Sequence, residues 1–291
     1  MRNEEEILHQ ILNFAANNDT IRLVSLEGSR TNESLKKDGF EDYDISFFCT
    51  DTKRFIENEE WLLEFGDLIF LQKPEDMEFY PPDLKGSWFS FLCTYEDGVK
   101  IDFTVIPLCD LNFYLKNEKL SKFLLDKDSL ISNHKASIED FFIKKLTQRS
   151  FDDVLNEFYH LKSYAYRHFF RKDNLSFIFY INAMRETLFI MLVWELALPF
   201  ARINNSCAEF DFSMGKHYKC LKNYISKKRY KKILKTYKLG YKNSNLKALR
   251  LIQKLFKKSY KKLAKNMNFN IKNYEHSIKH YIKTIKPKIS C

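Results

Sequence analysis

The sequence predicts an α+β protein in which a mixed sheet with flanking helices forms the first half and an α-helical bundle forms the second. Runs rich in β-branched and aromatic residues recur before residue 107, whereas apolar residues recur every three or four positions from Asp152 onward. The formal charge divides in the same way. Residues 1–150 carry 18 Lys and Arg against 29 Asp and Glu, a charge of −11, and residues 151–291 carry 30 against 9, a charge of +21. This asymmetry indicates two domains, which we place at residues 1–140 and 141–291.

In the first half, Asn3 to Glu6 has the pattern of a capping box, and the apolar residues from Ile7 to Ala15 follow at helical spacing. Five strands are expected after this helix, at residues 21–27, 43–49, 67–72, 88–95 and 99–106. Glu96-Asp97-Gly98 joins the last two as a hairpin turn. Pro74, Pro81 and Pro82 indicate an irregular loop at 73–85.

In the second half, helical patterns cover five stretches, namely 154–170, 175–197, 218–237, 249–263 and 271–285. The most apolar stretch, residues 177–200, is interrupted by Arg185, Glu186 and Glu195. A membrane span requires about 20 nearly uninterrupted apolar residues, so this segment is expected to be a buried core helix.

The composition favours a folded cytoplasmic protein. Six cysteines form no CxxC pair and have no histidine at metal-ligand spacing, which is typical of reduced thiols in the cytosol. The N-terminus is acidic and lacks the apolar segment of a secretion signal. We therefore expect no membrane association.

Three short motifs point to phosphate chemistry: Gly28-Ser29-Arg30, Asp42-Tyr43-Asp44, and Asp102 within an apolar strand. Two residues apart at the start of a strand, Asp42 and Asp44 project from one face. Neighbouring carboxylates repel unless a cation separates them, and their hard oxygens suit Mg²⁺. The Gly-Ser turn can bring backbone N–H groups close to phosphate. Metal and phosphate together indicate nucleotidyl or phosphoryl transfer.

Each motif also has a simpler interpretation. Gly-Ser-Arg is common, and an Asp-x-Asp at a strand end is often only part of a turn. Asp102 is flanked by β-forming residues and so needs a partner or a metal, but it could instead face solvent or pair with Lys100. The order of the three motifs along the chain favours the functional interpretation.

These motifs resemble the polymerase-β-like nucleotidyltransferase superfamily and, within it, the aminoglycoside 6-adenylyltransferases. The segments that carry the closer resemblance are Leu26 to Asn32, Asp42 to Ile45, Gln72 to Glu78, Pro81-Pro82, Lys100 to Asp102, Asp126 to Asp128, Asp152-Asp153, Asn156 to Phe158 and Ser213 to Lys219. The resemblance spans nearly the whole chain and implies a nucleotidyltransferase sheet domain followed by a helical substrate- and nucleotide-binding domain.

The resemblance implies transfer of AMP from ATP to a hydroxyl of an aminoglycoside, with Mg²⁺ as cofactor. Asp42, Asp44 and Asp102 would hold the metal, and Asp102 would also accept the proton of the attacking hydroxyl. The expected nucleotide contacts are Gly28, Ser29, Arg30 and Lys216. Lys216 could equally be a solvated side chain in a Lys-rich helix.

An aminoglycoside is a polycation, so its pocket should be acidic. Asp152, Asp153 and Glu157 are nearly the only carboxylates in this part of the basic half, and Asp153 and Glu157 would share a helix face. They are the candidate drug-binding residues, although acidic residues are also common near helix N-termini. Glu75, Asp76 and Glu78 are weaker candidates.

Two other functions fit the same residues. The acceptor could be another antibiotic, a protein or an RNA end. The Lys-rich and aromatic segments 227–232 and 257–262 would alternatively suit a nucleic-acid-binding protein on the same scaffold. Those lysines lie mostly opposite the apolar stripes, as on a solvated helix face, so nucleic-acid binding is not expected. The expected partners are ATP and an aminoglycoside. The expected oligomeric state is a monomer.

Overall fold

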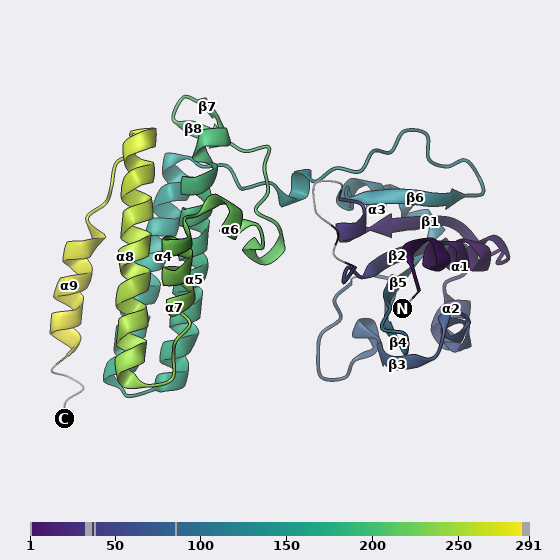
Figure 1. Cartoon of the computed structure of the whole chain (residues 1–291), viewed down its shortest axis with the longest axis horizontal. Helices are drawn as coiled ribbons and strands as arrows, with labels where there is room; N and C mark the ends of the chain where they lie inside the picture. The colour runs from purple at the N-terminus through teal and green to yellow at the C-terminus, as the bar shows by residue number, and fades with distance from the viewer. Residues whose placement is uncertain (1, 33–36, 38, 85, 287–291) are drawn as a thin grey trace. The chain divides into compact units, whose positions relative to one another are not determined.

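The computed structural model describes residues 2–32, 37, 39–84 and 86–286. The chain forms two compact units, Met1–Asp140 and Phe141–Cys291 (Figure 1). The first unit is built on a mixed sheet with flanking helices, and the second is a helical bundle with one small hairpin. The predicted α+β class is therefore confirmed.

The sheet of the first unit has the strand order β3-β4-β5-β2-β1-β6. Its strands are β1 (Ile21–Glu27), β2 (Tyr43–Cys49), β3 (Leu68–Gln72), β4 (Phe89–Tyr95), β5 (Lys100–Pro107) and β6 (Ser121–Asp126). Within the sheet, β2 and β5 are parallel and the other neighbouring pairs are antiparallel. The helices of this unit are α1 (Glu4–Ala16), α2 (Lys53–Glu57) and α3 (Leu111–Asn117).

The two faces of the sheet belong to different apolar clusters. Ile7, Ile11 and Ala15 of α1 pack on the face that carries Tyr43 and Phe103, among others. The opposite face contributes a smaller cluster of Leu23, Phe48 and Ile106, covered by Tyr114 of α3. Side chains alternate between faces along a strand, so Asp44 and Asp102 project on the α3 side.

The predicted capping box at the start of α1 is confirmed. Asn3 accepts a hydrogen bond from the Glu6 backbone N–H at 3.0 Å, and Glu6 accepts one from the Asn3 N–H at 2.8 Å. The hairpin turn between β4 and β5 is also present, with Gly98 at φ +83° and its N–H donating to the Tyr95 carbonyl at 2.9 Å.

One strand of the sheet, β6, was not expected. It pairs with β1 and forms an edge of the sheet. The polar segment at its end, Asp126 to Asp128, has a structural role. The Lys127 ammonium donates to the Ala15 and Ala16 carbonyls at the end of α1, and Asp128 forms an ion pair with Arg22.

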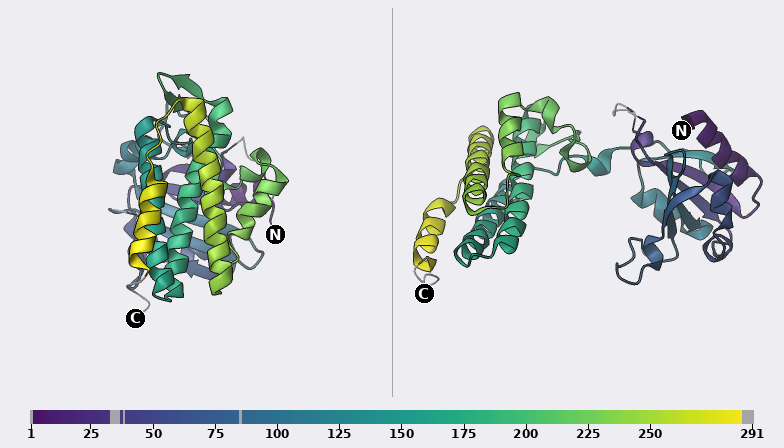
Figure 2. Two further views of the ribbon diagram at one scale, coloured as in Figure 1. Left: turned by 90° about the vertical axis from the view of Figure 1, so that its left-hand side faces the viewer. Right: turned by 60° about the horizontal axis from the view of Figure 1, so that its bottom comes forward.

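The second unit contains α4 (Gln148–Phe170), α5 (Asn174–Ala197), α6 (Leu221–Tyr224), α7 (Lys227–Lys235), α8 (Lys242–Met267) and α9 (Tyr274–Ile285). The short strands β7 (Arg202–Asn204) and β8 (Cys207–Glu209) form a hairpin, which was not expected. Helices α4, α5 and α8 lie side by side, with α9 against α4 (Figure 2). Helix α4 begins earlier than expected because Thr147 and Ser150 form a capping box at its start.

Helix α5 is the centre of this bundle. The stretch Asn174–Phe200 is long and apolar enough to cross a membrane. However, its sides pack against α4 and α8, and 56% of its most apolar 18 residues are buried in the fold. Glu195, 2% exposed, pairs there with Arg229 of α7, so one cation of the Lys-rich segment 227–232 is used inside the bundle.

Candidate active site

Three acidic residues stand side by side on neighbouring strands of the first unit. Glu27 of β1 lies opposite Asp44 of β2, and Asp44 lies opposite Asp102 of β5. Residues in direct register point to the same face with Cα atoms about 4.5–5.5 Å apart. These three residues are called the acid row below. Folding thus brings together Asp44 and Asp102, which the sequence separates, and adds Glu27, which was not predicted.

A row of hydroxyl groups lies directly behind the acid row on the same face. Ser25, Ser46 and Thr104 occupy the next in-register positions of the three strands, and Ser90 of β4 follows beside Thr104. Ser25, Ser46 and Ser90 are buried. The acid row therefore lies between solvent and a polar layer, and the apolar cluster under α3 begins only one row further along.

Lys100 links Asp102 to Asp42. Its ammonium lies 2.7 Å from Asp42 Oδ2 and 2.8 Å from Asp102 Oδ2. Burial alone would lower the pKa of Lys100, but the two carboxylates hold it above its usual value. The simpler interpretation of Asp102, an ion pair with Lys100, is thus observed. This ion pair does not exclude a functional role for Asp102, because the same ammonium also contacts Asp42, another predicted metal-binding residue.

Asp102 retains unused bonding capacity. Its Oδ1 is buried and has no hydrogen-bond partner among the residues that the structure describes. Burial raises the pKa of Asp102 above its ordinary value, and Lys100 opposes that shift. A partly buried carboxylate with one unsatisfied oxygen favours binding of a cation or a proton donor.

Gly28 lies against Asp44 because it has no side chain. It ends β1 and begins a 3₁₀ turn, Gly28–Arg30, at φ +70°, a conformation that L side chains rarely adopt. A Cβ atom at this position would lie 2.3 Å from Asp44 Oδ2. The Gly28 N–H donates to the Leu120 carbonyl at 3.2 Å, so the turn's first N–H has a partner within the fold. The Ser29 hydroxyl has no hydrogen bond to any described residue.

Glu27 is the member of the acid row whose carboxyl contacts two hydroxyl groups of the fold. Burial raises the pKa of its carboxyl to about 8, against opposing hydrogen bonds from Ser25, Tyr114 and Ser46. Ser25 and Tyr114 both donate to Glu27 Oε1, and their hydroxyl oxygens lie 2.9 Å apart. Glu27 consequently binds its proton more tightly than an ordinary glutamate. Its position at the end of β1, directly before Gly28, is the one sequence signal that could have identified it.

Arg30 is packed against the segment that carries Asp42. Its guanidinium donates to the Glu41 and Asp42 carbonyls at 2.7 and 3.1 Å, and it pairs with Glu4 at 3.1 Å. It stacks 3.5 Å from the centre of the Tyr43 ring, and its side chain is 6% exposed. In this state Arg30 fixes the approach to β2, and its expected contact with a nucleotide stays a prediction.

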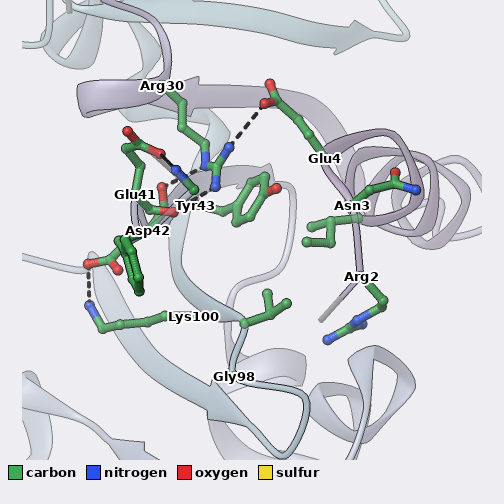
Figure 3. A pocket seen from close by; sticks show the side chains of 13 residues that line it. Arg2, Asn3, Glu4, Arg30, Glu41, Asp42, Tyr43, Gly98 and Lys100 are labelled. Carbon is green, nitrogen blue, oxygen red and sulfur yellow. Dashed lines mark hydrogen bonds and ion pairs between the residues drawn. The ribbon is translucent and has the colours of Figure 1, made fainter. Parts of the chain in front are cut away.

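A hollow of about 240 Å³ adjoins this arginine (Figure 3). Its lining includes Glu4, Arg30, Asp42, Tyr43 and Lys100. Asp42 and Lys100 therefore face both the hollow and the edge of the acid row. Charges of both signs line it, which suits a ligand that carries both, or one that arrives with a cation.

The remaining candidates belong to the second unit. Asp152, Asp153 and Glu157 lie on α4, and Asp153 and Glu157 are exposed without a hydrogen bond or ion pair to any described residue. Asp152 accepts a hydrogen bond from Gln148 at 3.0 Å and lies 3.5 Å from the Lys272 ammonium. Lys216 is exposed in a short 3₁₀ turn after Gly215.

The weaker candidates, Glu75, Asp76 and Glu78, differ in their surroundings. Glu75 accepts hydrogen bonds from the Leu84 and Ser90 N–H groups, at 3.1 and 2.7 Å, and so organises the loop before β4. Asp76 pairs with Lys73 at 3.3 Å, and Glu78 is exposed.

The carboxylates fit a divalent cation in two respects. Asp42 and Asp102 already share one positive charge, and Asp102 Oδ1 is an oxygen donor without a partner. Over the described ranges, no three His, Cys, Asp or Glu side chains converge as in a closed metal centre. Carboxylate oxygens are the donors that Mg²⁺ prefers, so Asp42 and Asp102, with Asp44 in the adjacent register position, are the residues that would hold it.

The sheet carries carboxylates on adjacent strands beside a Gly-Ser turn. This arrangement is expected of the active site of a nucleotidyltransferase. The family model described as streptomycin adenylyltransferase matches residues 1–285. The aminoglycoside 6-adenylyltransferase of Bacillus subtilis (strain 168) is 40% identical over 289 residues, covering 98% of each chain. The Staphylococcus aureus aminoglycoside 6-adenylyltransferase is 38% identical over 286 residues, covering 97% of this chain and 98% of the relative.

The chain belongs to the streptomycin adenylyltransferase family, so the family predicted from the motifs is confirmed. A solved crystal structure of an aminoglycoside 6-adenyltransferase from Bacillus subtilis shares 37% sequence identity, with coverage of 98% of this chain and 99% of that one and a TM-score of 0.46.

Proposed function

We propose that this protein transfers AMP from ATP to the 6-hydroxyl of streptomycin, releases pyrophosphate and thereby inactivates the antibiotic. Membership of the streptomycin adenylyltransferase family and the names of the relatives support this reaction. The structural observation that carries the proposal is the in-register placement of Asp44 and Asp102 beside the Gly28 turn, with Asp42 joined to Asp102 through Lys100.

In this proposal, Asp42, Asp44 and Asp102 would hold Mg²⁺. The ion would supply positive charge that offsets the charge of the triphosphate and makes the α-phosphorus more electrophilic. Asp102 accepts the proton of the attacking drug hydroxyl, for which its raised pKa is suitable. The hydroxyl oxygen forms a bond to the α-phosphorus as the bond to pyrophosphate breaks.

The proposed nucleotide contacts are Gly28, Ser29, Arg30 and Lys216. Gly28 gives the triphosphate access to the turn because it carries no side chain, and the Ser29 hydroxyl donates to phosphate. Arg30 offers positive charge to the leaving pyrophosphate after it exchanges its contact with Glu4. Lys216, an exposed lysine, is a further proposed contact to phosphate.

Drug recognition depends on acidic side chains of α4. Asp153 and Glu157 are exposed, four residues apart and without partners among the described residues, so they can pair with ammonium or guanidinium groups of the drug. Asp152 binds the drug only after exchange of its contact with Lys272. The enzyme is proposed to be a monomer. Its proposed location is the cytoplasm, where ATP is available.

The test is release of pyrophosphate from ATP and Mg²⁺ in the presence of streptomycin, kanamycin or no acceptor. Release with streptomycin alone is expected, and it should disappear in Asp44→Asn. Asp83→Asn, which changes an exposed carboxylate of the same unit, is the matched control and should retain wild-type release. Release with kanamycin alone would assign another acceptor, and release without any drug would contradict the proposed reaction.

A further inference from the structure

Lys100 is placed by the sheet itself between two carboxylates. It begins β5 two positions before Asp102, so both side chains project from the same face. Tyr43 lies opposite Ile101, and the preceding residues, Asp42 and Lys100, come together at the strand ends. Over the described ranges, no other Lys, Arg or His forms an ion pair with either carboxylate.

The geometry shows what this ammonium does for the two acids. Its distances of 2.7 Å to Asp42 Oδ2 and 2.8 Å to Asp102 Oδ2 place those oxygens within hydrogen-bonding reach of a single cation. Figure 3 shows the contact between Lys100 and Asp42. Without a cation, two carboxylates this close would repel each other. Lys100 is therefore a positioning residue that holds the two carboxylates together.

A divalent ion would need the same oxygens. Magnesium binds carboxylate oxygen at about 2.0–2.1 Å. An ammonium still bonded to those oxygens would lie beside the metal, where the two positive charges repel. The side chain of Lys100 is 37% exposed and has flexible methylene torsions, so its ammonium can leave toward solvent while β5 stays in place.

We propose that Lys100 is a resident counter-cation that competes with a divalent metal ion for Asp42 and Asp102. It holds the two carboxylates together before the metal arrives and releases them as the metal binds. The inference rests on the proposed function only in assigning this metal to adenylyl transfer. The competition itself belongs to the free protein and can be measured without ATP or drug.

The test is a titration of the free full-length protein with Mn²⁺, in which bound metal is measured by loss of the free-ion electron paramagnetic resonance signal. Lys100→Met removes the competing charge, so its Mn²⁺ dissociation constant is expected to fall at least tenfold. Lys100→Gln, a polar neutral variant, should move the constant in the same direction. Mg²⁺ should also raise the melting temperature of either variant more than that of the wild type.

Lys73→Met is the matched control, because Lys73 also bridges two carboxylates of this unit, Glu59 at 2.6 Å and Asp76 at 3.3 Å. Its Mn²⁺ affinity should equal that of the wild type. If both Lys100 variants bind Mn²⁺ no more tightly than the wild type, and the wild type transfers AMP, the competition is overturned and the proposed function stands. Tighter binding by the Lys100 variants, with a wild type that adenylylates no acceptor, would remove the proposed function and leave the competition intact.

Discussion

Gly28→Ala should have two effects: it should lower folding stability through an unfavourable backbone conformation, and it should displace the Asp44 carboxylate. An alanine at φ +70° costs about 1–2 kcal/mol of folding stability. Its Cβ atom would also lie 2.3 Å from Asp44 Oδ2, about 1 Å short of ordinary van der Waals contact. Moving the Asp44 side chain off its rotamer adds about 0.5–1.5 kcal/mol. We expect a total loss of about 1.5–3.5 kcal/mol, the sum of the two contributions.

Activity should fall more steeply than stability. Misplacement of a reacting group by about 1 Å can lower a rate about 100-fold, so Gly28→Ala should lose about two orders of magnitude in kcat while it remains folded. Gly86→Ala is the control, because Gly86 has φ +84° and nothing within 4 Å of its added Cβ. It should share the backbone cost, measured by urea unfolding, and keep full activity. Wild-type kcat in Gly28→Ala, or an equal loss of kcat in Gly86→Ala, would refute the proposed contact with Asp44.

Three further predictions follow from buried and exposed carboxylates. Because the pKa of Glu27 is raised from 4.5 unfolded to about 8 folded, the folded protein holds an extra proton between these values. The stability due to this group is therefore complete below pH 4.5 and is lost as the pH rises through 8, by at most about 1.4 kcal/mol per pH unit. Glu27→Gln should make the free energy of unfolding in urea depend less steeply on pH. An unchanged slope would contradict the raised pKa of Glu27. Glu195→Gln should destabilise the second unit by about 3 kcal/mol, since it leaves the Arg229 charge buried, and a loss below 1 kcal/mol in urea unfolding would show that the pair is dispensable. Asp153→Asn combined with Glu157→Gln should raise the KM for streptomycin about tenfold and leave the KM for ATP unchanged, whereas equal changes in both constants would argue against drug binding.

The strands that position the site could be predicted because their apolar side chains alternate with few interruptions. β2 and β5 differ from the expected ranges by no more than about one residue, and Asp102 was conspicuous as a charge inside such a run. The edge strand β6 was missed because its burial is partial and its six residues show little alternation. The hairpin β7–β8 has only three residues in each strand, too few for a periodic signal.

The site residues that the sequence did not indicate depend on register between distant segments. Glu27 acquires its role from lying opposite Asp44, and Lys100 from lying beside Asp42 after β2 and β5 pair in parallel. Neither pairing leaves a local pattern in the sequence. Arg30 shows the reverse case, because its motif predicted a phosphate contact while its guanidinium also fits the carbonyls of Glu41 and Asp42.

The central claim is adenylyl transfer to streptomycin by a carboxylate site, and the mass of the drug after reaction tests it most directly. Streptomycin incubated with the protein, ATP and Mg²⁺ should gain one AMP group, located on the 6-hydroxyl by NMR of the product. The same incubation with Asp102→Asn should leave the drug unmodified, although the variant folds. Unmodified streptomycin with the wild type, a phosphoryl group in place of AMP, or full transfer by Asp102→Asn would contradict the account.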